Sequence, residues 1–476
     1  MKRSTLRPIA LAAAVAASGG ACRKPPPAEI VYTGAATPGA AAAGSSSEGG
    51  GSAPRGGAPS SPELNAGGPR APLTAAPSGG GSGSAAAGPS NVAVVSATPT
   101  SCTPPAAASG PFSKAQLIGA AADCAVWHYC EFESSTRALE STSAAYRDDP
   151  SAANQSRAQQ AFLATMGSWE RAELFRFGPA ARSGEPGGAD LRDLIYAWPV
   201  RPECKTDEQT LSQLYLTPEY HALDFGVSPV TGRTLTALEY LLFNPALQNR
   251  CSAYSSINAG GGWAALAADD LRARRRAYAA EAAADVRARA EQLTQAWGEG
   301  GFFARFTQPG PGNPRLESEQ QVLNAVSNAL FYLDTEFKDQ KLATPLGLTP
   351  ECTSSVCPDA VESRYTDASI AYLKQNLVGF RRLFQGCGEG YAGVGFDDWL
   401  RDAGAGDLAE RMIASLNGVD AAVDRVPGSL AQTLVTSREL PLALHAAVKE
   451  VTDELKTEFV TVLNLELPSA AEGDND

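Results

Sequence analysis

Apolar side chains recur every three to four positions from about residue 112 to residue 467, and alternating strand-like patterns are nearly absent. This period places the apolar residues on one face of a helix, and such a face must pack against other helices. We therefore predict an all-α fold of two packed helical bundles. The glycines and prolines of residues 298–312 favour a boundary there, giving bundles at residues 111–300 and 301–467.

The predicted helices are bounded by prolines, glycines and polar residues. Asp149-Pro150 should break one long helix from the next, and Gly178-Pro179 should end the second. The expected helices cover residues 112–148, 151–177, 191–196, 207–215, 231–243, 263–297, 318–341, 358–385, 396–417 and 439–465.

The segment before these helices has a different composition. Residues 22–110 consist mostly of Ala, Gly, Ser and Pro, with almost no large apolar side chain. Such a segment cannot bury enough surface to offset its conformational entropy. We expect a disordered tether here, and a frayed acidic tail at residues 468–476.

The first 21 residues are typical of an export signal. Lys2, Arg3 and Arg7 precede a short apolar stretch at residues 9–17, which is too short to span a bilayer. Gly20-Ala21 then precede Cys22, as in a bacterial lipobox, although Gly19 stands where leucine is usual. We expect lipidation at Cys22 and anchoring in the cell envelope, in the periplasm or at the outer membrane. Cleavage by an ordinary signal peptidase is the alternative.

Eight cysteines remain after Cys22, an even number that favours disulfides in an exported chain. Cys352 and Cys357 flank a short loop, and Cys204 and Cys251 lie just outside helical segments, so these are the two candidate pairs. Cys124 and Cys130 are expected on one helix, too far apart to bond each other. Zinc is disfavoured because the chain lacks paired C-x-x-C units with nearby histidines.

The formal net charge is −13, and removal of the three basic signal residues makes it −16. An acidic surface of this kind repels phosphate backbones. The sequence therefore excludes nucleic acid as a favoured partner, and leaves a membrane, through Cys22, and a small ligand or metal between the bundles.

One carboxylate interrupts an apolar helical run. Glu239 lies in Leu235-Thr236-Ala237-Leu238-Glu239-Tyr240-Leu241-Leu242-Phe243, where an uncompensated charge is costly. Arg201 and Arg233 are the candidate cations for an ion pair with Glu239. A structural ion pair or hydrogen-bonded network between the bundles, a ligand-contacting carboxylate and a catalytic base are the three roles that remain open.

Five segments resemble the imelysin family, in the order in which that family has them. They are Trp169-Glu170-Arg171-Ala172-Glu173-Leu174-Phe175-Arg176-Phe177-Gly178-Pro179, Tyr196-Ala197-Trp198-Pro199-Val200, the Glu239 segment, Lys341-Leu342-Ala343-Thr344-Pro345-Leu346-Gly347 and Glu362-Ser363-Arg364-Tyr365-Thr366-Asp367. The resemblance implies two helical bundles in an envelope protein with a site between them. It also makes Glu362 and Arg364 ligand-binding candidates. Imelysins were named as peptidases, and relatives act in iron uptake.

The family pattern has a histidine where this chain has Thr236. A threonine hydroxyl is neutral at pH 7 and a poor ligand for iron or zinc, so we assign no catalytic residue and no metal ligand. We count Thr236 with Glu239 only as a ligand-binding candidate. His221 is the candidate to return an imidazole to this position.

We therefore expect a non-catalytic binding protein linked to iron or another nutrient. The alternatives are a divergent metallopeptidase that uses Glu239, and a structural or partner-binding module of the envelope. Iron or another divalent metal is the cofactor class that stays open.

Overall fold

The computed structural model describes residues 102–106, 110–221, 230–298 and 301–472. The chain divides into two units, Met1–Ser82 and Gly83–Asp476, and all described residues belong to the second. The predicted signal peptide, Cys22, most of the tether and the end of the acidic tail lie outside the described residues. Within the described ranges the structure contains helices and no strand, which confirms the all-α prediction.

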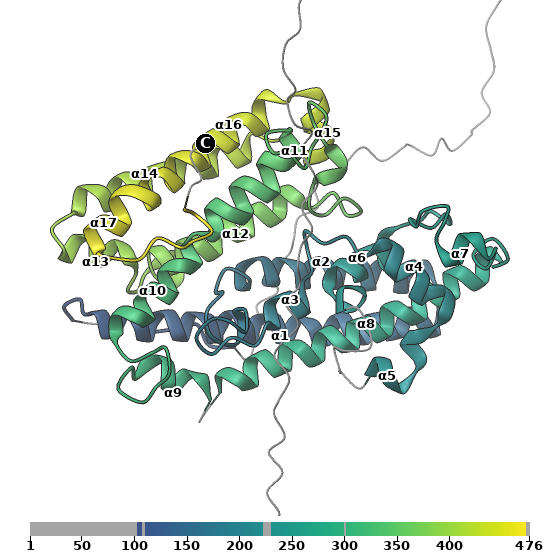
Figure 1. Cartoon of the computed structure of the whole chain (residues 1–476), viewed down its shortest axis with the longest axis horizontal. Coiled ribbons are helices and arrows are strands. Elements are labelled where there is room, and N and C mark those ends of the chain that lie inside the picture. Colours follow the sequence, from purple (N-terminus) through teal and green to yellow (C-terminus); the bar gives the residue numbers. More distant parts are fainter. Residues whose placement is uncertain (1–101, 107–109, 222–229, 299–300, 473–476) are drawn as a thin grey trace, which may run out of the picture. The chain divides into compact units, whose positions relative to one another are not determined.

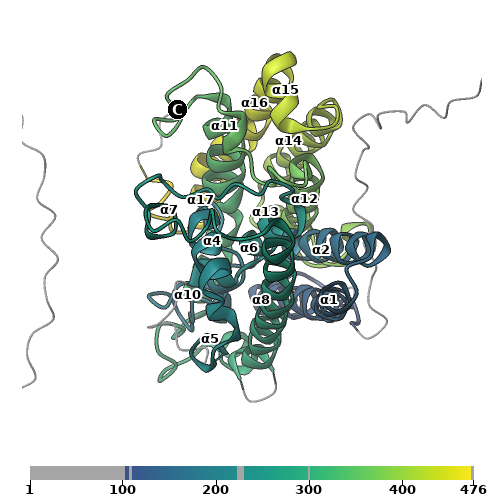
Figure 2. The ribbon, with the colours of Figure 1, turned by 90° about the vertical axis from the view of Figure 1, so that its right-hand side faces the viewer.

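Three long helices form the first layer: α1 (Lys114–Asp148), α2 (Ala152–Ala172) and α8 (Ala268–Trp297). Helix α1 packs against both α2 and α8 along its length (Figures 1 and 2). Short helices surround this layer: η1 (Gly178–Ala180), α3 (Leu191–Ile195), α4 (Glu203–Ser212), η2 (Leu214–Leu216), α5 (Pro218–His221), η3 (Val230–Arg233), α6 (Leu235–Phe243), α7 (Ser256–Ala259) and α9 (Phe302–Thr307).

The second group of helices lies above the first in Figure 1. Its members are α10 (Glu319–Leu330), the π-helix η4 (Leu333–Ala343), α11 (Thr344–Leu346), η5 (Pro358–Ala360), α12 (Ser369–Phe384), η6 (Glu389–Tyr391), α13 (Phe396–Asp402), α14 (Gly406–Asp424), α15 (Leu430–Thr436), α16 (Glu439–Glu454), the π-helix η7 (Leu455–Phe459) and α17 (Val460–Leu463). Helix α14 packs against α16, which packs against η4, while α12 packs against α2 of the first layer. Buried apolar residues of both groups join in one continuous core that includes Phe132, Trp169, Phe380 and Leu416.

Helix ends follow the polar residues of the sequence. Ser113 and Ser151 cap α1 and α2, because each side chain accepts a hydrogen bond from a backbone N–H of the first turn. None of the described helices combines the length and the apolar character needed to cross a lipid bilayer. Helix α9 follows residue 300 and packs against α1 and α8, and the domain boundary near residue 300 stays a prediction.

Several predicted helices were wrong in extent or type, and the helix expected at residues 439–465 turns into the π-helix η7 after α16. The helix expected at residues 396–417 is split between α13 and α14, where Gly404 takes a φ of +82°. The helix expected from residue 358 begins only at Ser369, because the preceding segment is taken up by η5 and turns. The helix expected at residues 318–341 changes from α10 to the wider π-helix η4.

All eight cysteines of the described residues form disulfides. Cys352–Cys357 and Cys204–Cys251, the two pairs singled out in the sequence, are bonded. Cys124 and Cys130 do not bond each other. They pair instead with cysteines outside their own helix, as Cys124–Cys387 and Cys102–Cys130. The Cys124–Cys387 bridge links α1 to the segment after α12 and thereby ties the two helical groups covalently.

Candidate functional site

Glu239 lies on α6 with 8% of its surface exposed. Its Oε1 accepts hydrogen bonds from the backbone N–H groups of Tyr365 (3.0 Å) and Thr366 (3.2 Å). The Thr366 hydroxyl also donates to this oxygen, at 3.4 Å. The Glu239 carboxylate therefore fixes the segment that precedes α12 against helix α6.

The expected arginine partner of Glu239 is wrong, whereas the alternative of a hydrogen-bonded network agrees with the bonds from Tyr365 and Thr366. Arg233 donates instead to Asp285 of α8, with 2.7 Å between Nη2 and Oδ1, and Arg201 lines an open cleft. Backbone amides take the place of a cation because the 362–366 segment folds directly over α6. Burial raises the pKa of Glu239 to about 7, and the two backbone donors offset only part of this effect.

The described residues do not return an imidazole to the position beside Glu239. The Thr236 hydroxyl oxygen is buried and has no hydrogen-bond partner among them. His221 is the last residue of α5, and its side chain lies outside what the structure describes. Of the other two histidines, His128 pairs with Glu131 and His445 lines the cleft.

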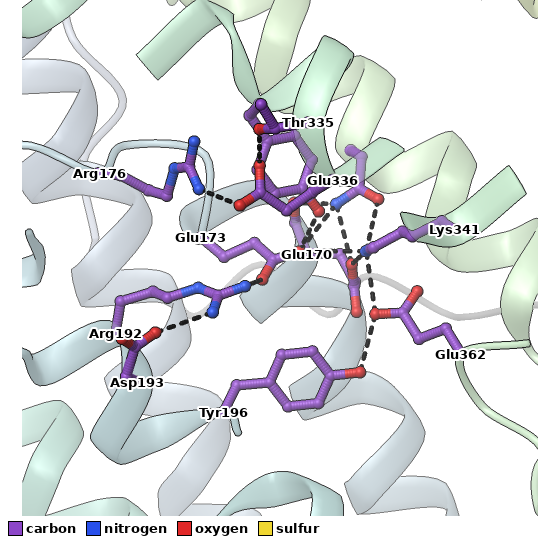
Figure 3. Close-up of polar contacts among 12 residues, drawn as sticks. Glu170, Glu173, Arg176, Arg192, Asp193, Tyr196, Thr335, Glu336, Lys341 and Glu362 are labelled. Carbon is purple, nitrogen blue, oxygen red and sulfur yellow. Dashed lines mark hydrogen bonds and ion pairs between the residues drawn. The ribbon is translucent and has the colours of Figure 1, made fainter. Parts of the chain in front are cut away.

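A cluster of charged side chains is buried between the two groups of helices (Figure 3). Lys341 Nζ, on η4, lies 2.7 Å from Glu170 Oε2, 3.1 Å from Glu173 Oε1 and 2.9 Å from Glu362 Oε1. It also donates to Asn376 Oδ1 at 2.9 Å. All five residues are at most 2% exposed. We call Glu170, Glu173, Lys341, Glu362 and Asn376 the Lys341 cluster.

Further donors surround the Lys341 cluster. Arg192 Nη2 lies 3.2 Å from Glu173 Oε2, and the Tyr332 hydroxyl donates to Glu173 Oε1. Tyr196 donates to Glu362 Oε1 at 2.8 Å. These contacts draw on both helical groups, so the cluster fixes one group against the other.

The surroundings shift the pKa values of Glu170, Glu173 and Glu362 in different directions. Burial raises the pKa of Glu170 well above its usual value, and burial also raises that of Glu362. Burial has the same tendency at Glu173, but Lys341 and Arg192 outweigh it and hold that pKa at about 2. The three carboxylates in turn outweigh the effect of burial on Lys341 and raise its pKa, so the ammonium stays charged.

The three carboxylates of the Lys341 cluster resemble a metal site in their spacing, but the arrangement around them does not suit a metal ion. One oxygen from each of Glu170, Glu173 and Glu362 lies within 4.8 Å of the others. Hard divalent cations favour such oxygens. The Lys341 ammonium, however, contacts one oxygen of each carboxylate and takes the central position. These residues therefore do not fit a resident divalent metal in the arrangement that the structure has.

A cleft of about 1320 Å³ opens next to the cluster. Trp198 lines this cleft, and its ring centre is 5.7 Å from Lys341 Nζ, so the indole lies between the cleft and the buried ammonium. The cleft is lined by Trp198, Pro199, Arg201, Thr335, Asp339, Gln340, Ala343, Thr344, Leu348, Thr349, Pro350, Glu351, Cys357, Asp359, Ala360, His445 and Ala470.

The ligand-binding candidates chosen from the sequence do not form a single site in the structure. Glu362 belongs to the Lys341 cluster and is close enough to Glu239 to raise its pKa. Arg201 lines the cleft, and Arg364 is close enough for its positive charge to lower the pKa of Arg201. Arg233 is remote from both, in its ion pair with Asp285.

Sequence reasoning missed Glu170, Glu173, Lys341 and Asn376 as site residues. Glu170, Glu173 and Lys341 lie within two of the segments that carry the family resemblance. Unlike Glu239, these residues have charged or polar neighbours in the sequence, such as Arg171 beside Glu170 and Lys338-Asp339-Gln340 before Lys341, so they do not stand out. The helical period alone does not show which charges face the core, because long polar side chains also border apolar faces.

These features define a helical, disulfide-bonded protein with a buried carboxylate–ammonium cluster and an adjoining open cleft. The model of the Imelysin family matches residues 125–457, well over half of the chain. The chain therefore belongs to the imelysin family.

Solved structures agree with this assignment at the level of the fold. An imelysin-like protein from Psychrobacter arcticum 273-4 is similar with a TM-score of 0.56 and 16% identity, over 75% of this chain and 96% of the other. A candidate iron-regulated protein A precursor from Parabacteroides distasonis ATCC 8503 has a TM-score of 0.54 and 15% identity, over 75% and 97%. No curated protein matches the chain.

Proposed function

We propose that this imelysin-family protein binds a small ligand in the cleft and catalyses no reaction on it. The cleft carries this proposal, because it is the large accessible cavity next to the family segments. Glu239 and the Lys341 cluster are closed off from solvent, and their charges are engaged by backbone amides and by an internal ammonium. A reactant has no open route to them.

The proposed role is in the cell envelope and in the acquisition of iron or another nutrient. Support comes from the family and from the description of one structural relative as iron-regulated. Anchoring by lipid at Cys22 is part of the proposal. Cys22→Ser should move the protein from the membrane fraction to the soluble fraction, and persistent membrane attachment of this variant would refute the anchor.

A ligand screen on the purified protein tests the cleft. Organic acids, amino acids, sugars and metal chelates are added in turn, and the thermal midpoint is recorded. Ala360 of η5 lines the cleft and is only partly buried, so Ala360→Trp should fill the cavity and remove any ligand-dependent rise. Ala153→Trp, on the exposed face of α2, is the matched control and should leave the rise intact.

The competing function is a metallopeptidase that uses Glu239. It requires peptide cleavage that is lost in Glu239→Gln and on chelation of metal. Two features argue against a metallopeptidase. The Lys341 ammonium fills the centre of the carboxylate cluster, and Thr236 stands where a metal-binding histidine would be needed beside Glu239, so the described residues form no open metal position with an adjacent base. A structural module without a ligand is the third reading, and it requires that Ala360→Trp change nothing but stability.

A further inference from the structure

The strongest unexplained group in the cleft is the guanidinium of Arg201. It is only partly exposed to solvent in the cleft, and it makes no hydrogen bond or ion pair with any described residue. The surroundings withdraw water from it and lower its pKa, and the positive charge of Arg364 adds to this effect. An arginine held in a cleft under these conditions gains from binding an anion, because the anion restores both hydrogen bonds and charge.

Nearby acidic groups do not satisfy Arg201. Glu203 faces Arg364, with 3.8 Å between Oε1 and Nη1, and the Arg364 guanidinium also lies 4.9 Å from the ring centre of Tyr365. Asp359 lies at the cleft close enough to act on Arg201 through its charge, but no hydrogen bond joins the two. Arg201 therefore lies in the cleft with its charge incompletely compensated, and the nearby positive charge of Arg364 acts on it as well.

The other carboxylates of the cleft limit what kind of anion fits. Asp339 pairs with the buried Lys338, at 3.1 Å between Oδ1 and Nζ. Glu351 and Asp359 are exposed at the cleft, so an anionic ligand gains more there when part of it is neutral, cationic or metal-bearing.

We propose that the cleft takes a small carboxylate-bearing molecule whose carboxylate binds Arg201 in a bidentate manner. This inference rests on the proposed binding function and adds the chemistry of the ligand. Trp198, which lines the same cleft, offers an apolar surface to the carbon skeleton, and Arg364 is close enough to Arg201 to add positive charge. The carboxylate source is a free organic acid or the same acid as a metal chelate.

Calorimetric titration of the full chain with citrate, ferric citrate and inorganic phosphate tests the proposal. Citrate or ferric citrate should bind, and Arg201→Gln should weaken binding by about tenfold or more, since a hydrogen bond to a charged group is lost. Arg425→Gln is the matched control, because Arg425 is exposed on α14 and bonds only to a carbonyl of its own helix. It should leave the affinity unchanged. Added salt should weaken the Arg201-dependent binding.

The outcomes are distinct. Binding of citrate in both forms supports the free acid, and binding of ferric citrate alone supports the chelate. Phosphate binding as tight as that of citrate, an affinity unchanged in Arg201→Gln, or no binding of either citrate form overturns the inference. If a neutral or cationic compound from the screen binds instead and Ala360→Trp abolishes it, the carboxylate inference fails while the binding function stands.

Discussion

Replacing Glu239 by glutamine tests whether the buried carboxylate of helix α6 is held without a cationic partner. The glutamine oxygen accepts the same hydrogen bonds from the backbone amides of Tyr365 and Thr366. The exchange removes only the ability of the side chain to ionise. Because no cation among the described residues partners Glu239, the ionised form is the costly one in the folded protein.

The size of the effect follows from the shift in the pKa of Glu239, from 4.5 to about 7. One pKa unit corresponds to about 1.4 kcal/mol, so the shift corresponds to about 3 kcal/mol. Between these two pKa values the folded protein binds more protons than the unfolded chain, and linkage then requires that stability fall as pH rises. Wild type should lose about 3 kcal/mol at this site between pH 4.5 and pH 7.5, and Glu239→Gln should not.

Urea denaturation at pH 5 and pH 8 measures the difference. The free energy of unfolding of Glu239→Gln, relative to wild type, should rise by about 3 kcal/mol from the lower to the higher pH. Glu291→Gln makes the same exchange at an exposed carboxylate of α8 and should stay within about 0.5 kcal/mol of wild type at both pH values. If Glu239→Gln is instead strongly destabilised at pH 8, the carboxylate has a cationic partner and the reasoning is refuted.

Two further predictions concern the contacts that join the helical groups. Lys341→Met leaves three buried carboxylates without their ammonium and should lower the free energy of unfolding in urea by about 3–5 kcal/mol. Lys374→Met removes a surface pair with Asp424 and should lower it by about 0–1 kcal/mol. Equal losses would contradict a buried cluster. Removal of the Cys124–Cys387 bridge by paired serine substitution should cost about 5–6 kcal/mol, and removal of Cys352–Cys357 about 2 kcal/mol, because they close loops of very different length. Similar losses would mean that the long bridge does not constrain the unfolded chain.

Most of the fold could be predicted from helical periodicity and from helix-breaking residues. Helices α1, α2 and α8 begin and end within five residues of the predicted positions. Serine caps begin α1 and α2, and Pro150 follows the end of α1. The break at Gly404 and the π-helix η4 were missed. Both depend on how a segment packs against its neighbours rather than on its own sequence.

The candidate site was predicted only in part. Glu239 was recognised because a carboxylate in an apolar run stands out, and Glu362 because of the family resemblance. Their partners were not predictable, since the amides of Tyr365 and Thr366 belong to the backbone and leave no signal in the sequence. Lys341 meets Glu170 across 171 positions of the chain, a pairing that only the tertiary fold determines.

The response of the thermal midpoint to the strongest binder of the screen, compared among wild type, Ala360→Trp and Glu239→Gln, tests the central claim most directly. A ligand held in the cleft raises the midpoint of wild type and of Glu239→Gln equally, and does not raise that of Ala360→Trp. A rise that survives in Ala360→Trp but is lost in Glu239→Gln would place binding at helix α6 and contradict the account.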